Sequence, residues 1–401
     1  MSKKLTPVIL SAVRTPIGKF QGALNSLSAV QLGSIVIRSA VERSQINSKQ
    51  DIDEVLMGNV VQAGVGQAPA RQAAIFAGLP ASVGATTINK VCGSGLKAAM
   101  FAAQAIRAGD GKLFVSGGME SMSRAPFLVH GRSGELRYGN VEMKDSLLSD
   151  GLWDPFENWG MGNAADHIAE KFGVTREAMD QFSFESHQKA LKAIETGKFK
   201  REITAVEITG RKGEITIIEQ DEGPRRETSI EGLAKLKPAF RKDGWVTAGN
   251  SSSLNDGAAA NVISSLEYAE VHGIKPLARI VAYGHAAQES KLLFGAPAIA
   301  IPMVLEKAGW KLSDVDLIEL NEAFAAQVLA NGYALKDAGW NWDKVNVNGG
   351  AISLGHPIGA SGARIIATLI YALKERNLKR GIASLCLGGG EAVAMALEIE
   401  S

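Results

Sequence analysis

Residues 87–95 read TINKVCGSG, and an alanine-rich helical pattern follows them. A matching arrangement lies near the other end of the chain, where NVN at residues 346–348 precedes GGAISLGHPIGASG at residues 349–362 and a second helical pattern. With three further pairs of similar segments, the chain contains four matches in the same order, which predict that one half of the chain is a duplicate of the other. The three further pairs, which lie about 260–270 positions apart like the first, are residues 51–57 with 313–319, 114–118 with 385–389, and 7–13 with 278–283.

Short β-rich runs alternate with helical patterns inside each half. Helices are expected over residues 30–44, 95–108, 302–309 and 362–375. Alternation of strands with helices of this length favours a mixed or parallel sheet that is covered on both faces. Two such halves predict two sheets with helices between them, which is a layered α/β/α/β/α body.

The segment 119–249 fits neither half. Its charged residues are concentrated between positions 211 and 242. We interpret it as an inserted loop domain, with the first half occupying residues 1–118 and resuming at about 250–270, and the second half occupying residues 271–401. Two explanations of these charges are open: the segment presents a solvated face, or it covers a bound cofactor.

Composition argues against several kinds of partner. The chain has 401 residues, of which 46% are apolar and 21% charged, and its net charge is +1. That balance suggests no surface for nucleic acid or for an anionic membrane. No apolar run of the ~18 residues that a membrane span needs is present, and the N-terminus does not resemble a signal peptide.

The six histidines and two cysteines also limit the possibilities. Two cysteines far apart in sequence do not make a disulfide framework, which favours a reducing compartment. The histidines other than His356 show no metal-ligand spacing, so no metal site is expected. The final residues, EIES, are not a peroxisomal address. We therefore expect a cytoplasmic protein that binds neither nucleic acid nor membrane.

Cys92 lies between the end of an expected strand and the start of an expected helix, beside Gly93 and Gly95. A free cysteine is often only a small buried hydrophobic residue. At a helix N-terminus, unsatisfied amides and the helix dipole favour the thiolate and can hold a carbonyl oxyanion. Cys92 is therefore a candidate nucleophile whose thiolate is expected to be favoured.

His356 and Cys386 are the partners that such a nucleophile would need. The neighbours of His356 are a glycine and a proline, so its ring can face something other than its own loop and act as a base. A structural histidine is the alternative. Cys386 precedes three glycines at residues 388–390. A second thiol suggests proton transfer at carbon, because a carbon acid needs its own positioned base.

Together these segments resemble the thiolase family, over essentially the whole chain. Their order and spacing are highly specific. The resemblance implies the thiolase fold, in which duplicated α/β/α/β/α layers carry an inserted loop domain, and an acyltransferase activity. The matching motifs are VRTPIGKF at residues 13–20, VCGSG at 91–95, NEAFA at 321–325, GAISLGHPIGASGAR at 350–364 and CLGGGE at 386–391.

The resemblance implies a role for each of five residues. Cys92 would accept the acyl group, His356 would activate it, and Cys386 would remove and return the α-proton of a second thioester. Asn321 would hold a water that forms one oxyanion site with His356, and the amides of Cys92 and Gly388 would form the other. The implied reaction is reversible and ping-pong: acetyl-CoA acylates Cys92, CoA leaves, and a second acetyl-CoA attacks to give acetoacetyl-CoA.

The resemblance also implies contacts with coenzyme A, which would be bound as a substrate thioester and not as a permanent cofactor. Arg225 matches a contact to the adenine part, with a solvated surface charge as the alternative. Ser252 matches a contact to pantetheine, and Met161 matches a residue that limits acyl length. Ala248 and Phe324 belong to the same expected binding set.

Residues 254–256 and the stretch 130–161 resemble the short-chain acetyl-CoA acetyltransferases of the family. One departure is Gly160, where biosynthetic members usually have histidine, so the acyl pocket could be wider. A degradative 3-ketoacyl-CoA thiolase of broader chain length is therefore an alternative. A non-catalytic acyl-CoA or lipid carrier is a distant one, because the full set of reactive residues is retained. Residues 132–140 resemble an arm that joins dimers, which predicts a homotetramer.

Overall fold

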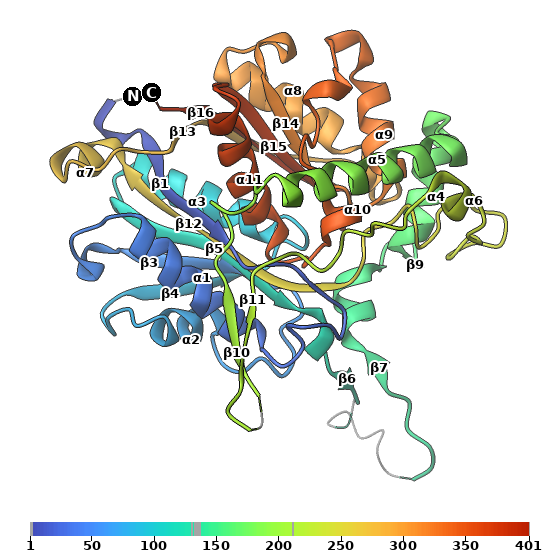
Figure 1. Ribbon diagram of the computed structural model, residues 1–401, viewed down its shortest axis with the longest axis horizontal. Coiled ribbons are helices and arrows are strands. Elements are labelled where there is room, and N and C mark those ends of the chain that lie inside the picture. Colours follow the sequence, from blue (N-terminus) through green and yellow to red (C-terminus); the bar gives the residue numbers. More distant parts are fainter. Residues whose placement is uncertain (1–2, 130, 132–137, 211, 401) are drawn as a thin grey trace.

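One long mixed sheet runs through the molecule and divides into two half-sheets (Figure 1). The computed structural model describes residues 3–129, 131, 138–210 and 212–400. In spatial order the first half-sheet consists of β4 (Gly84–Ile88), β3 (Glu54–Gly58), β5 (Leu113–Ser121), β12 (Asn255–Ser265) and β1 (Pro7–Arg14). The second consists of β13 (Ala278–Ala287), β16 (Glu391–Ile399), β15 (Arg380–Leu387) and β14 (Leu317–Leu320).

The two half-sheets meet along a short seam. Val8 and Ile9 of β1 pair with Arg279 and Ala278 of β13, whereas β5 and β12 pair over nine residues. The order of strands repeats in the two halves, because β14 lies beside β15 as β3 lies beside β5, and both pairs are parallel. Val345 pairs in parallel with Ile318 of β14, at the place that β4 takes beside β3. The chain therefore builds the same topology twice.

Helices form three layers around the half-sheets. Between them lie α3 (Ser94–Ala108) and α11 (Ser361–Glu375), whose apolar side chains share one core with strands of both halves. The outer faces are covered by α1 (Ala29–Arg43) and α2 (Pro69–Phe76) on the first half and by α8 (Pro297–Ala308) and α9 (Ala325–Ala334) on the second. The expected α/β/α/β/α layering is confirmed (Figure 1).

Local signals explain where most of these helices begin and end. Ser28 caps α1 in a capping box with Gln31, and Gly109 ends α3 in the left-handed conformation. One expected start was wrong, because α8 begins at Pro297 and Pro302 lies inside it. A proline at the first helical position needs no N–H, and Pro297 takes that place instead of Pro302.

The chain leaves the first half after β5 and returns at β12. The excursion forms much of the right-hand and lower parts of Figure 1. The division into domains at residues 118 and 249 stays a prediction. The elements of the excursion are β6 (Phe127–Leu128), β7 (Lys144–Asp145), β8 (Trp153–Asp154), β9 (Trp159–Gly160), α4 (Met161–Phe172), α5 (Arg176–Glu195), β10 (Val206–Thr209), β11 (Ile215–Ile218) and α6 (Ile230–Ala234). Three further elements, which lie outside the excursion, are β2 (Gly18–Lys19), α7 (Leu266–Val271) and α10 (Ala351–Leu354).

The central helices α3 and α11 touch through their backbones. A Cβ atom at Gly95 would lie 2.7 Å from the Ala363 nitrogen, and one at Gly362 would lie 2.2 Å from the Leu96 nitrogen. Only glycine permits this approach. The contact places the first turns of the two helices side by side, and with them the loops that enter these helices.

The crossing predicts an unusual cost for a small substitution. Gly362→Ala adds a methyl group that overlaps main-chain atoms, and overpacking of this kind costs ~1–3 kcal/mol. We expect net destabilisation, although alanine gains about 1 kcal/mol in helix propensity. Gly84→Ala is the matched control, because its Cβ would lie 3.8 Å from Glu54. Equal shifts of the two variants in denaturant unfolding would contradict the close contact.

Candidate active site

Loops from both halves meet beside the first turns of α3 and α11. Cys92 lies two residues before α3, His356 lies between α10 and α11, and Cys386 is the last residue but one of β15. The loop of Cys92 packs directly on the end of β15, because a Cβ at Gly93 would lie 2.3 Å from Leu387. The fold thus places Cys92 beside the strand of Cys386 and packs the histidine loop on the start of α3, where a Cβ at Gly95 would lie 3.2 Å from the Gly359 oxygen.

The turn that carries Cys92 is strained. Val91 has φ of +45°, a left-handed conformation that is an outlier for a β-branched residue. Local hydrogen bonds hold it, since Asn89 Oδ1 accepts from the Val91 amide and Ser94 Oγ donates to the Val91 carbonyl. Strain of about 1–3 kcal/mol persists only where the surroundings enforce it, and it is common at functional sites.

Cys386 is buried and Cys92 is half-buried, and both thiols stay protonated at neutral pH. Burial raises the pKa of Cys92 to about 12, and the Glu120 carboxylate adds to the rise, although hydrogen bonds from the amides of Cys92 and Gly388 oppose it. The expectation of a favoured thiolate was therefore wrong, because desolvation outweighs the helix N-terminus. Burial also raises the pKa of Cys386, and the neighbouring Cys92 contributes to that rise.

His356 is held as a neutral base. Its Nδ1 lies 2.6 Å from Ser361 Oγ, which donates its own hydrogen to the Pro357 carbonyl, so the proton sits on Nδ1. Its Nε2 lies 3.4 Å from Nδ2 of Asn321, an N–H donor, and is therefore the unprotonated nitrogen. Burial, followed by the charge of Arg364, lowers the pKa of His356 to about 3.

Glu120 joins the histidine loop to the first half. Its Oε1 accepts hydrogen bonds from the Asn59 side chain and the Val61 amide. Its Oε2 accepts from the amides of Val60 and Gly359. Burial raises the pKa of Glu120 to about 8, but an N–H donor faces each lone-pair position and leaves no place for a proton. The carboxylate is therefore an anion close to Cys92.

A cavity of about 250 Å³ lies beside α10, and neither cysteine is among the residues that line it. Arg225 and Ala248 line it, together with Leu254 and Ile352. Leu254 packs in the hydrophobic cluster that contains Cys92, and Ile352 packs in the one that contains Cys386. Two residues of the cavity wall thus belong to the hydrophobic clusters in which the cysteines pack.

The other expected binding residues lie around this cavity but do not line it. Ser252 donates its amide to the Ala323 carbonyl, while Ser251 and Ser253 face the cavity. Phe324 packs edge-to-face against two phenylalanines, Phe240 and Phe294, with ring centroids 6.2 and 5.2 Å away. Met161 and Phe324 pack in the hydrophobic cluster of Cys386.

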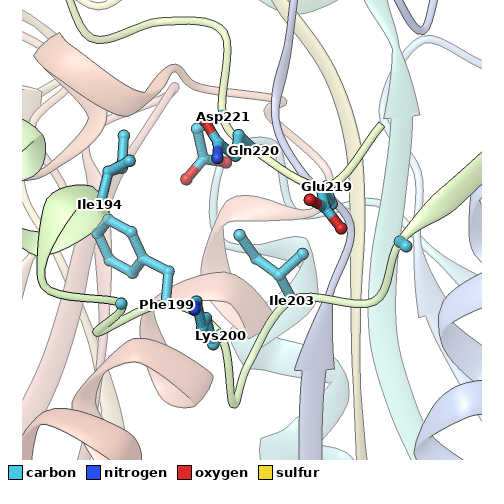
Figure 2. Close-up of a pocket in the computed structure, with 9 residues that line it drawn as sticks. Ile194, Phe199, Lys200, Ile203, Glu219, Gln220 and Asp221 are labelled. Atoms are coloured by element: carbon cyan, nitrogen blue, oxygen red, sulfur yellow. The ribbon is translucent and has the colours of Figure 1, made fainter. Parts of the chain in front are cut away.

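A second cavity, of about 300 Å³, is unrelated to the thiols. Ile194, Phe199 and Asp221 are among the residues that line it (Figure 2). Behind it, the buried guanidinium of Arg14 bonds both oxygens of Asp221 and one oxygen of Glu202. None of the site residues expected from the sequence lines this cavity.

Sequence reasoning missed three buried polar residues that hold the reactive ones: Glu120, Ser361 and Arg364. They occur within apolar and glycine-rich sequence, where a charged or hydroxyl side chain is unusual, and that was the available signal. Within the described part of the chain, no group of three or more His, Cys, Asp or Glu side chains is placed to hold a metal ion. Among the same residues, no helix is long and apolar enough to span a membrane.

Comparisons with known proteins agree along nearly the whole chain. Residues 7–267 match the family described as thiolase, N-terminal domain, and residues 274–399 match thiolase, C-terminal domain. An acetyl-CoA acetyltransferase of Pseudomonas aeruginosa is 52% identical, covering 97% of this chain and 98% of its own length. One from Escherichia coli K12 is 50% identical over 98% of both. The crystal structure of the Bacillus anthracis acetyl-CoA acetyltransferase superposes with a TM-score of 0.95 at 44% identity, covering 98% of this chain and 99% of that one.

The protonated state of Cys92 predicts the pH dependence of its alkylation. With a pKa of about 12, the thiolate fraction grows about tenfold per pH unit throughout the neutral range. We expect the rate of iodoacetamide labelling at Cys92, followed by peptide mass spectrometry, to rise in that proportion from about pH 6 to about pH 9. A plateau in this range would instead show a thiolate stabilised by a charged histidine.

Proposed function

Because this chain belongs to the thiolase family, we propose that it is an acetyl-CoA acetyltransferase. The reaction joins two acetyl-CoA molecules into acetoacetyl-CoA with release of CoA, and it is reversible. The chain is an acyltransferase whose relatives at about 50% identity carry this name. The observation that carries the proposal is a pair of neighbouring thiols, Cys92 and Cys386, together with an imidazole whose unprotonated Nε2 faces Asn321, a residue fixed to the strand of Cys386.

The first half-reaction forms an acyl-enzyme on Cys92. The thiol proton passes to Nε2 of His356 as the sulfur attacks the thioester carbonyl carbon. The amides of Cys92 and Gly388 already point at this sulfur, and they would stabilise the oxyanion that develops there. The carbon–sulfur bond to CoA then breaks, and the departing CoA thiolate takes the proton from His356.

The second half-reaction forms a carbon–carbon bond. Cys386 would first pass its thiol proton to Nε2 of His356, and the resulting thiolate takes a proton from the methyl group of a second acetyl-CoA. The raised pKa of this thiol makes its thiolate a strong base for a weak carbon acid. Asn321, through the water that it would hold, and His356, now protonated on Nε2, would stabilise the enolate oxygen. The carbanion attacks the acetyl carbon on Cys92, the bond to that sulfur breaks, and the Cys92 thiolate takes the proton from His356, which leaves both cysteines as thiols.

CoA would lie in the cavity that Arg225 and Ala248 line, with Ser252, Met161 and Phe324 around the pantetheine and acyl ends. The substrates would then be acetyl-CoA, acetoacetyl-CoA and CoA, without a permanently bound cofactor. A cytoplasmic homotetramer is part of the same proposal. Its support is the resemblance of residues 132–140 to a dimer-joining arm, of which residues 132–137 lie outside the described residues.

Broader chain length, as in a degradative 3-ketoacyl-CoA thiolase, is the second candidate. One observation favours it: Gly160 precedes Met161, which packs in the cluster of Cys386, and a Cβ at Gly160 would contact only Asn163, at 3.5 Å. The backbone of Gly160, at φ −78° and ψ 159°, suits any residue. The fold therefore has room for a side chain that this sequence lacks.

The two half-reactions can be separated by substitution. We expect Cys386→Ala to accept an acetyl group on Cys92, seen by peptide mass spectrometry after acid quench, but to lose condensation and methyl-proton exchange with D₂O. His356→Ala should slow acetylation itself by about 10²–10⁴. Near-normal condensation by Cys386→Ala would make the second thiol structural, and an unacetylated wild-type protein would support a non-catalytic carrier.

The room beside Gly160 predicts a change in chain-length preference. Gly160→His should lower kcat/KM for longer 3-oxoacyl-CoA substrates by about tenfold more than for acetoacetyl-CoA, a size expected for filling part of an acyl pocket. Gly160→Ala is the matched control and should leave kcat/KM unchanged both for longer 3-oxoacyl-CoA substrates and for acetoacetyl-CoA. If Gly160→His affects all chain lengths equally, then Gly160 does not shape the acyl pocket.

A further inference from the structure

Arg364 is a buried cation beside the candidate active site, and the proposed mechanism gives it no role. It lies in the first turn of α11, three residues after Ser361, and is 2% exposed. Its guanidinium donates one hydrogen bond to Glu319 Oε2 and another to Asn321 Oδ1, both at 3.3 Å. One planar group therefore bridges a carboxylate and the amide that contacts His356.

The chemistry of the guanidinium fixes the direction of the Asn321 amide. Arginine has donors and no acceptor, so the end of the amide that faces Arg364 must be its oxygen. The NH₂ end then points the opposite way, to within 3.4 Å of His356 Nε2. The two ends of an amide have nearly the same shape. Without the cation, a flipped Asn321 would turn a carbonyl oxygen toward the place where an enolate oxygen develops.

Strands β14 and β15 fix the positions of the two residues that Arg364 contacts, Glu319 and Asn321. Glu319 is at the end of β14, two residues before Asn321, and it is also buried. The Asn321 amide N–H donates to the carbonyl of Ser384 in β15, two residues before Cys386. The backbone of Asn321 is thus fixed to the strand of the second thiol, and the remaining freedom is rotation of its side chain.

We propose that Arg364 is a positioning residue for the second half-reaction, which directs the NH₂ group of Asn321 toward the oxyanion site of the second thioester, where Asn321 would hold the water. This rests on the proposed function. Acylation of Cys92 uses the amides of Cys92 and Gly388, so it does not depend on the orientation of Asn321. The two half-reactions should therefore respond differently to a change at Arg364.

Arg364→Lys tests this difference. A lysine keeps a cation next to Glu319, but its single nitrogen cannot bridge two acceptors in the fork geometry of a guanidinium. We expect condensation and methyl-proton exchange to fall about 10²-fold, the usual cost of losing one oriented oxyanion donor. Exchange of labelled CoA into acetyl-CoA, which requires only acylation of Cys92, should stay near the wild-type rate.

A double-mutant cycle distinguishes positioning from general damage. If Arg364 acts through Asn321, then Arg364→Lys should cause no further loss of condensation in an Asn321→Ala background. Full additivity of the two losses would overturn the proposal. Should Arg364→Lys not fold, Glu319→Gln loosens the anchor of the guanidinium and should give a smaller split in the same direction, whereas equal loss of both half-reactions by Glu319→Gln would overturn it.

Arg107→Lys is the matched control. Arg107 lies in the last turn of α3 and donates to the carbonyls of Ile280 and Val281, away from the thiols. Both half-reactions should be unchanged in this variant. A wild-type protein without CoA exchange or condensation would refute the proposed function itself. An active wild type whose Arg364→Lys variant loses both half-reactions equally would refute only the role of Arg364.

Discussion

The backbone contact between the two central helices is the constraint on which the site depends. Gly95 and Gly362 let α3 and α11 touch, and further glycines extend this close approach to the histidine loop. The carbonyl oxygen of Gly359 lies 1.9 Å from a Cβ built at Gly118 and 2.8 Å from one built at Gly58. The loop from the second half is therefore seated on glycines of two strands from the first half, β3 and β5. Glycine serves here to shorten a distance, not to add flexibility.

This close packing determines the charge state of the reactive groups. A thiol and an imidazole that are both neutral avoid the cost of burying a separated ion pair. In the proposed reaction, charge then develops only as the substrate reacts, next to the Cys92 sulfur, to which the amides of Cys92 and Gly388 donate hydrogen bonds. Fixed dipoles in a dry site stabilise such charge more strongly than water-exposed donors, because they need no reorganisation. The buried Glu120 carboxylate opposes an early thiolate and so supports the same resting state.

The fold could be predicted, and candidate reactive residues could be proposed, because both leave local signals in the sequence. Repeated strand and helix patterns indicated the duplicated layers, and glycine neighbours marked Cys92, His356 and Cys386. The pKa of Cys92 could not be predicted in this way. The helix N-terminus is a local feature, but the desolvation that outweighs it comes from segments distant in sequence, such as the loop of Ile358.

Residues that act through others were missed for the same reason. Ser361 fixes the proton of His356, and Arg364 meets Asn321 across 43 positions of sequence, contacts that exist only in the folded chain. The roles of Arg225, Ser252 and the other CoA contacts stay predictions, since their partner is the substrate.

The duplicated backbone carries unlike chemistry in its two halves. Each half runs from an edge segment through a tight loop into a central helix, and these equivalent loops carry a thiol in one half and an imidazole in the other. The repeated segments align Cys386 with Val115, which packs in the outer core of the first half. Two identical halves would place the same side chains on both sides of the seam between the half-sheets. Acyl transfer, however, needs two different groups, a nucleophile and a base. The site therefore arises where the sequences of the halves have diverged while their topology has not.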